Sequence, residues 1–349
     1  MPPTPSPSSM VSAAILRGDW PAVLQAASDW SDQLKRAGRS SPVPWFAMNA
    51  AHLIRGEFAR AWEAHTACLQ KEEDIAEVRE WVEALAEQHS RDAYVKLVAG
   101  LYLSQSGQSE RSVDIYKEAI ALAPQLPSPH YFLAQIHERA GQPELAIKEY
   151  REAIKLDPAY LPARLNLGVA YQEQGRLELA IPQYREIIRL QPDDAMAHAN
   201  LACALAEQGK LEPALLEYKA ALLLNPRDAH LHFSLAGIYE AKGRRDLVLK
   251  CYQDALQADP NFAPAETAIG WLLFEKNRFQ DAMEAFNRAL KSDQDDARAY
   301  YGIGRVYAAL GKREAAWENY SKALKLEKDP DRKSKIMNHL FTEGGTWDV

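Results

Sequence analysis

The chain has 349 residues, of which 47% are hydrophobic and 26% charged, and its formal net charge is −7. This ordinary globular composition excludes a collagen-like fibre and disorder along the whole chain. The 41 basic residues are outnumbered by 48 acidic ones, so no basic surplus is available to neutralise the phosphates of a nucleic acid. We therefore expect no nucleic-acid partner.

The three cysteines, Cys68, Cys203 and Cys251, lie far apart in the sequence and form neither a disulfide framework nor a zinc-binding cluster. We expect reduced thiols, no bound metal and a cytoplasmic location. No apolar run approaches the roughly 20 residues that a spanning helix needs, so we expect no membrane segment. Residues 1–10, rich in proline and serine, predict a disordered tail.

A period of 34 residues organises the chain from residue 93 to residue 330. Glycine, proline, an aromatic residue and a small residue each recur with this period, and the aromatic column runs without a gap through Tyr116, Tyr150, Tyr184, Tyr218, Tyr252, Phe286 and Tyr320. Four columns with one period indicate a repeat architecture. The predicted units are 93–126, 127–160, 161–194, 195–228, 229–262, 263–296 and 297–330.

Each column has a mechanical role within a pair of helices. The glycine at unit position 15, such as Gly141, supplies the left-handed residue that ends a first helix and lets the chain reverse. The proline at position 32, such as Pro158, cannot continue the second helix and closes the unit. Small residues at positions 8 and 20 let the two helices approach, and the aromatic residue at position 24 fills the space between them.

These columns resemble the tetratricopeptide repeat family over all of residues 93–330, and residues 163–175 (ARLNLGVAYQEQG) are close to its usual first helix. The resemblance implies an all-α fold, a right-handed α-solenoid of helix-turn-helix repeats. The sequence departs from the family pattern at position 4, where no unit has tryptophan. Asn277 replaces the turn glycine of one unit, and Gln294 and Lys328 replace the last two prolines.

The segments that flank the regular units are expected to be helical as well. Residues 11–92 predict a divergent region with a helix pair at about 10–38 that turns at Gly18, and a degenerate repeat at 42–75 containing Trp45, Gly56 and Ala61. An amphipathic stretch from Ile75 to His89 predicts an inserted helix. Residues 331–349 predict a capping helix followed by a tail.

By resemblance to the family, helix positions 2, 6, 9 and 13 line a concave groove, with position 5 at its edge. Asn166 and Asn200 occupy position 6 of successive units. An amide can donate to a peptide carbonyl and accept from a peptide N–H, so this pair is expected to hold an extended polypeptide. The pair resembles a short form of the asparagine ladder of O-linked N-acetylglucosamine transferase; the alternative is that both asparagines only solvate the groove.

Aromatic and basic side chains are the other candidates for the groove. The expected apolar contacts with a partner are Tyr131, Phe132, Phe233, Trp271, Phe274 and Tyr301, and the alternative is packing between neighbouring helices. Arg298 and Arg305 form one basic spot that could bind a carboxylate. The alternative is that both side chains are only solvated. The lysine and asparagine pattern with which some family members grip acidic chaperone tails is missing.

No nucleotide-binding, zinc-protease or serine-hydrolase motif is present, so we expect no enzyme activity and no cofactor. The sequence thus predicts a non-catalytic adaptor or scaffold that binds an extended or partly helical polypeptide segment in the groove. An assembly factor that recruits an enzyme or complex through the convex face or the N-terminal region remains an alternative, and a metal or small-molecule carrier is a third. The sequence leaves self-association open.

Overall fold

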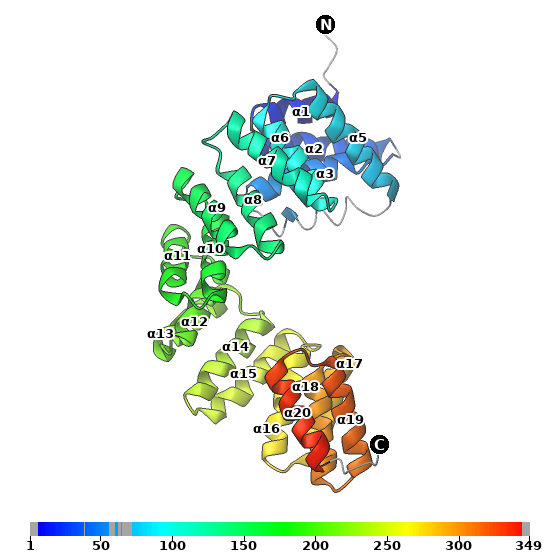
Figure 1. The fold of residues 1–349 in the computed structure, drawn as a ribbon, viewed down its shortest axis with the longest axis vertical. Coiled ribbons are helices and arrows are strands. Elements are labelled where there is room, and N and C mark those ends of the chain that lie inside the picture. The colour runs from blue at the N-terminus through cyan, green and yellow to red at the C-terminus, as the bar shows by residue number, and fades with distance from the viewer. Residues whose placement is uncertain (1–5, 38, 56–59, 62–63, 65–71, 344–349) are drawn as a thin grey trace. The chain divides into compact units, whose positions relative to one another are not determined.

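A computed structural model describes residues 6–37, 39–55, 60, 61, 64 and 72–343. Within these ranges the regular secondary structure is helical, with no strand (Figure 1). The fold is an all-α tetratricopeptide-type helical solenoid, as the 34-residue period predicts. The chain divides into two compact units, residues 1–190 and residues 191–349, and this division lies within the regular array rather than at its start.

The first compact unit holds an N-terminal group of helices and three regular repeats (Figure 1). The N-terminal group consists of α1 (Pro7–Leu16), α2 (Trp20–Arg36), α3 (Val43–Ile54) and α5 (Glu72–Gln88). The repeats are the pairs α6 (Ala93–Gln105) with α7 (Ser109–Leu122), α8 (Pro127–Arg139) with α9 (Pro143–Leu156), and α10 (Leu161–Glu173) with α11 (Leu177–Leu190).

The second compact unit holds four regular repeats and a terminal helix. Its pairs are α12 (Ala195–Glu207) with α13 (Leu211–Leu224), α14 (Ala229–Ala241) with α15 (Arg245–Ala258), α16 (Ala263–Glu275) with α17 (Phe279–Ser292), and α18 (Ala297–Ala309) with α19 (Arg313–Leu326). The terminal helix α20 (Pro330–Glu343) packs against α19, in the place expected for the capping helix.

The turn between the two helices of a repeat forms as the glycine column predicts. Gly141 has a φ of 68° and Asn277, which replaces glycine, has a φ of 58°. Beyond each of these residues a backbone N–H reaches back to the end of the first helix: Gln142 N donates to the His137 carbonyl at 2.9 Å, and Arg278 N donates to the Leu273 carbonyl at 3.0 Å. Asparagine tolerates the left-handed conformation, so the substituted turn keeps the same geometry.

The N-terminal segment differs from the expected tail in one respect. Helix α1 begins at Pro7, inside the segment 1–10, because the Ser6 hydroxyl accepts a hydrogen bond from the Ser9 N–H at 3.2 Å and proline suits the first turn of a helix. The predicted turn at Gly18 is present, with a φ of 63°. The expected inserted helix corresponds to α5. Gly56, one of the marker residues of the degenerate repeat, lies outside the described residues.

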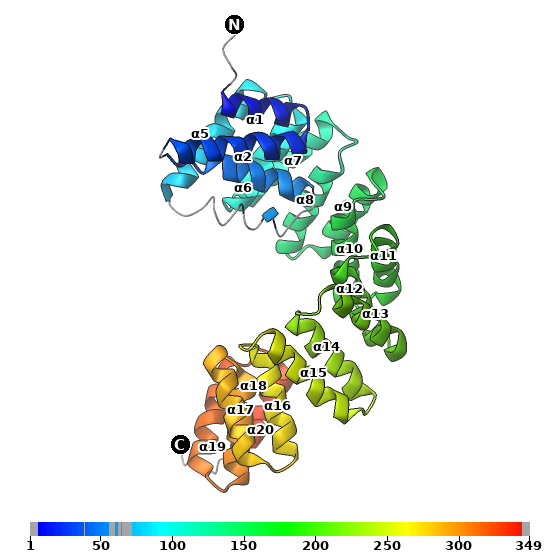
Figure 2. The ribbon, with the colours of Figure 1, turned by 180° about the vertical axis from the view of Figure 1, so that it is seen from behind.

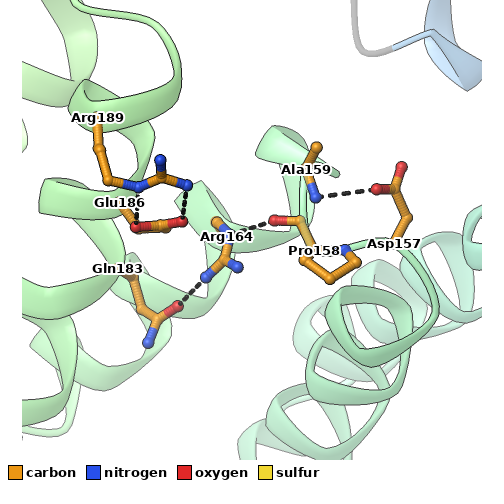
Figure 3. Close-up of polar contacts among 7 residues, drawn as sticks. All are labelled: Asp157, Pro158, Ala159, Arg164, Gln183, Glu186 and Arg189. Carbon is orange, nitrogen blue, oxygen red and sulfur yellow. Dashed lines mark hydrogen bonds and ion pairs between the residues drawn. The ribbon is translucent and has the colours of Figure 1, made fainter.

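A polar contact takes the place of the missing tryptophan at repeat position 4. Arg164 on α10 donates from Nε to the Pro158 carbonyl at 2.8 Å and from Nη1 to Gln183 on α11 at 3.3 Å (Figure 3). In the preceding repeat, His130 on α8 contacts the Glu149 carboxylate on α9 at 2.7 Å. The same position in other repeats forms ion pairs or hydrogen bonds through Lys96, His198, His232 and Glu266. In most repeats position 4 therefore joins the two helices by polar contacts, whereas His232 contacts the Pro226 carbonyl that ends the preceding repeat.

The packing of Phe286 against Gly270 lets us test whether the fold depends on the close approach of α16 and α17. Phe286 on α17 is fully buried, and a Cβ atom added to Gly270 on α16 would lie 2.6 Å from its ring. A Cβ atom on Gly302 of α18 would meet the same ring. We expect Gly270→Ala to lower the local free energy of opening by about 1–2 kcal/mol, because overpacking outweighs the gain in helix propensity. Amide hydrogen exchange of α16 and α17 in the full chain measures this.

The matched control for that substitution is Gly237→Ala on α14. No atom lies within 4 Å of a Cβ added there, so alanine should stabilise its helix by about 0.5–1 kcal/mol. Equal effects of the two substitutions on exchange would contradict the packing account.

The pair His130–Glu149 gives a second prediction, on pH dependence. The hydrogen bond from His130 lowers the pKa of Glu149 below its ordinary value. A carboxyl group whose pKa is lower in the folded state contributes stability above its unfolded pKa of about 4.3, and this contribution is lost as the pH falls through the folded pKa. We expect Glu149→Gln to cost about 1 kcal/mol at pH 6, and this cost to shrink progressively as the pH is lowered below about 4.3, measured by urea unfolding.

Glu152→Gln on the same helix is the control for the pH prediction. Glu152 pairs with Lys155 at 3.1 Å in an exposed contact, which contributes about 0.3–0.5 kcal/mol at most. A pH profile of Glu149→Gln that matched that of Glu152→Gln would argue against a special contribution from the half-buried contact with His130.

Candidate functional site

Asn200 lines a pocket of about 450 Å³ between α12 and α14 in the second compact unit. Polar side chains from three helices share this pocket: Asn200 and Cys203 from α12, Tyr218 from α13 and Ser234 from α14. Burial raises the pKa of Tyr218, so its phenol stays protonated at neutral pH. Asn225, Asp228 and His230 also line the pocket, so it combines two amides, a carboxylate, an imidazole and two hydroxyl groups with apolar surface from residues such as Leu231. These groups can donate to and accept from a peptide backbone.

Asn166 has a different environment from Asn200. Its amide Nδ2 donates to the Tyr150 hydroxyl at 3.2 Å, and that hydroxyl in turn donates to Glu138 Oε2 at 3.0 Å. Burial raises the pKa of Glu138. Part of the hydrogen-bonding capacity of Asn166 is therefore used within the first compact unit, and the predicted ligand role for the pair is better supported for Asn200.

The structure corrects the expectation for Tyr131 and Phe132, which are interior residues and not exposed contacts. Tyr131 has none of its surface exposed and Phe132 has 4% exposed. Their rings are 5.1 Å apart, and Tyr131 also packs edge-on against Tyr160 at 5.5 Å. The hydroxyl of Tyr160 donates to the Ile54 carbonyl at the end of α3, at 3.4 Å.

The N-terminal helices cover the first regular repeat as well. Val98, which occupies groove position 6, is 1% exposed and belongs to one core cluster with residues of α1, α2, α3 and α5. Side-chain contacts across this junction include Phe46 with Tyr102 at a ring distance of 6.0 Å and Gln105 Nε2 with Asn49 Oδ1 at 2.8 Å. Figure 2 shows α1 and α2 grouped with α6 in the first unit. The predicted groove is therefore filled by the chain itself at this end.

Phe233 and Phe274 in the second unit are half-buried. Phe233 packs on Tyr252 at 5.4 Å and on Phe262 at 5.7 Å. Phe274 packs edge-on against Trp271 at 5.8 Å, and the Arg305 guanidinium lies 5.4 Å from the centre of its ring. Each ring keeps some exposed surface, so both packing and contact with a partner are available to it.

Trp271, Arg298, Tyr301 and Arg305 come together in a second pocket, of about 260 Å³. Helix α20 completes this pocket with Arg332, Lys335 and Ile336. Tyr301 is 9% exposed and is held by a contact between its hydroxyl and His339 Nδ1 at 3.2 Å. The sequence analysis found the two arginines on α18 but did not place Arg332 and Lys335 with them, because helical periodicity does not show which part of α18 those side chains of α20 border.

The described part of the chain holds no group of three or more histidine, cysteine or acidic side chains arranged for a metal ion. Burial raises the pKa of the Cys251 thiol to about 11, so this cysteine is protonated at neutral pH. Cys203 donates from Sγ to Glu207 Oε1 at 3.3 Å. Cys68 lies outside the described residues.

Among the described helices, none combines the length and the apolar character needed to cross a membrane. The cytoplasmic location stays a prediction.

The repeat geometry agrees with sequence comparisons. A family model described as "Tetratricopeptide repeat" matches residues 97–160 and 131–195, one described as "TPR repeat" matches 202–243 and 270–311, and a further "Tetratricopeptide repeat" model matches 229–262 and 297–330. The chain belongs to the tetratricopeptide repeat family, whose members are generally protein-interaction scaffolds. A comparison with curated proteins finds no match.

Solved structures with a similar fold include two that cover most of this chain. A tetratricopeptide repeat protein from Parabacteroides merdae is 16% identical, with a TM-score of 0.59, over 70% of this chain and 97% of that protein. Yeast Tom70 is 13% identical, with a TM-score of 0.58, over 96% of this chain and 87% of that one. At these identities the likeness concerns the fold alone. The resemblance of the asparagine pair to O-linked N-acetylglucosamine transferase stays a prediction.

Proposed function

We propose that this protein is a non-catalytic adaptor or scaffold that binds an extended or partly helical polypeptide segment in the groove of its second compact unit. The observation that carries the proposal is the pocket at Asn200, where groups that can hydrogen-bond a backbone surround an apolar surface. Its partner is a protein or peptide, and the binding needs no cofactor.

Two features of the pocket support a polypeptide ligand. Asn200 and Ser234 occupy the same position in successive repeats, so each repeat contributes one polar side chain to the groove. An amide that both donates and accepts can pair with the backbone of an extended chain whatever its side chains. Phe233 adds partly exposed apolar surface in the same unit, where a partner side chain can pack.

A non-catalytic role is consistent with the ionisable groups. The largest pKa shifts belong to buried tyrosines such as Tyr116 and Tyr131, where burial raises the pKa of each phenol. Tyr116 and Tyr131 pack between the helices of the repeats and line neither pocket of the second unit. Tyr218 does line the Asn200 pocket, and burial raises the pKa of its phenol in the same way. Their perturbed pKa values therefore reflect packing rather than acid–base chemistry.

The test measures binding to an array of nine-residue random peptides with the full chain and its Asn200→Ala variant. Losing one hydrogen bond to the backbone should weaken binding by about 1 kcal/mol, or about fivefold, while the helical circular dichroism stays the same. Asn166→Ala is the comparison: because Asn166 bonds to Tyr150, we expect it to loosen α9 and α10 more than it affects peptide binding. Unchanged binding by Asn200→Ala would remove the groove proposal.

Cys203 provides an independent readout of groove occupancy. It lines the Asn200 pocket, so a bound peptide should slow its alkylation by a maleimide, and peptide mapping identifies the modified cysteine. Cys251 is the internal reference, since it is 5% exposed and protonated at neutral pH. Slowing at both cysteines alike would indicate general stabilisation rather than occupancy of the groove.

The convex-face alternative rests on two exposed leucines of α13. Leu216 is 67% exposed and Leu223 is 85% exposed, and residues seven apart lie on one face of a helix. If the protein recruits its partner here, Leu216→Gln with Leu223→Gln should abolish affinity capture of that partner while Asn200→Ala has no effect. The reverse result favours the groove.

A further inference from the structure

The pocket beside Trp271 concentrates positive charge in a chain that is acidic overall. Four basic side chains line it: Arg298 and Arg305 from α18, and Arg332 and Lys335 from α20. Glu327 is the one acidic side chain in the lining. The chain as a whole has a formal net charge of −7, so this local excess of positive charge runs against its average.

Three of the four cations of this pocket are available to a ligand. Arg298, Arg332 and Lys335 are exposed, and over the described ranges no ion pair involves any of them. Glu327 is 9% exposed, and its Oε1 already accepts hydrogen bonds from the backbone N–H groups of Lys328 and Asp329, at 2.9 and 3.1 Å. With four basic side chains and one acidic side chain in its lining, the pocket carries a net positive charge.

The remaining lining of the pocket is apolar and aromatic. Trp271 and Tyr301 have ring centres 5.4 Å apart, and Ile336 and Ala297 add aliphatic surface. A volume of about 260 Å³ lies below the range of about 300–1,000 Å³ typical of pockets that enclose a whole small molecule. It suits one or two residues of a longer ligand that continues outside the pocket.

We propose that this pocket binds an acidic polypeptide segment, in which an apolar side chain packs on Trp271 and neighbouring aspartate or glutamate carboxylates pair with Arg298, Arg332 and Lys335. A free inorganic anion would leave the aromatic surface unused, whereas an acidic peptide with an apolar residue matches both parts of the lining. The inference rests on the proposed function in that its ligand is a polypeptide. It adds the charge of the partner and a contribution from α20, which lies beyond the repeats.

Fluorescence anisotropy with two matched peptides tests the proposal on the full chain. The acidic probe is Gly-Asp-Glu-Leu-Asp-Glu-Gly amide, and the neutral probe replaces each Asp by Asn and each Glu by Gln. We expect the acidic probe to bind at least tenfold more tightly at 50 mM NaCl, and this preference to shrink at 200 mM because salt screens exposed charges. Equal binding of the two probes overturns the proposal.

Substitutions then locate the charges that the acidic probe contacts. Arg298→Gln with Arg332→Gln should weaken its binding about tenfold or more, because two charge-assisted contacts are lost. Lys291→Gln with Lys325→Gln is the matched control: it also removes two exposed positive charges, on α17 and α19, that do not line the pocket. The same loss in the control would show a general effect of net charge and would contradict a defined site.

Charge reversal gives a gain of binding that a misfolded variant could not show. Arg332→Glu with Lys335→Glu should lose the acidic probe and gain affinity for a probe in which lysine replaces each Asp and Glu. Both substitutions are at exposed positions of α20. If the variant binds no lysine probe while circular dichroism shows it folded, these side chains do not contact the ligand and the proposal fails.

Competition distinguishes a peptide from other anions. Inorganic phosphate or a single-stranded oligonucleotide that displaced the acidic probe at equal charge concentration would overturn the assignment to a peptide. This test is separable from the groove proposal. If Asn200→Ala weakens binding to the random peptides but the chain shows no preference for the acidic probe, the present inference is refuted and the proposed function stands.

Discussion

The contact between a buried aromatic ring and a small residue of the facing helix is the constraint on which this fold depends. Tyr184 packs where a Cβ atom on Gly168 would lie only 2.6 Å from its ring, and Phe286 occupies the same place against Gly270. Both rings are fully buried. Because one large side chain fills the space between two closely spaced helices, each repeat forms a tightly packed pair, and its remaining first-helix positions are free to form a surface.

The two compact units use that surface differently. In the first unit, the inward-facing side chains of the early repeats are buried, and Tyr160 bonds to the end of α3. The same repeat positions in the second unit line pockets at Asn200 and at Tyr301. The N-terminal helices thus complete a hydrophobic core that the first repeats alone would leave exposed. Because they cover these repeats, the candidate binding surface lies in the second half of the chain.

The polar contacts at repeat position 4 show how this chain replaces a large aromatic residue of the family pattern. Arg164 reaches the second helix of its own repeat and the carbonyl of the proline that ends the preceding repeat (Figure 3). His198 makes the same two kinds of contact, and His130 reaches the second helix of its repeat. One side chain therefore links helices within a repeat and the turn between repeats. In the sequence, repeat position 4 only departs from the family pattern. Its structural role becomes clear from the residues with which it forms hydrogen bonds.

The sequence by itself determined the repeat period, the pairing of helices and the turn at Asn277, because these depend on residues close together in the chain. It also identified Arg298 and Arg305 as one basic spot, since they lie on the same helix. Only the tertiary structure decided that Tyr131 and Phe132 are interior, and that Arg332 and Lys335 join the arginines of α18. Both outcomes depend on which surfaces meet when distant helices pack, and helical periodicity marks an apolar face without specifying what covers it.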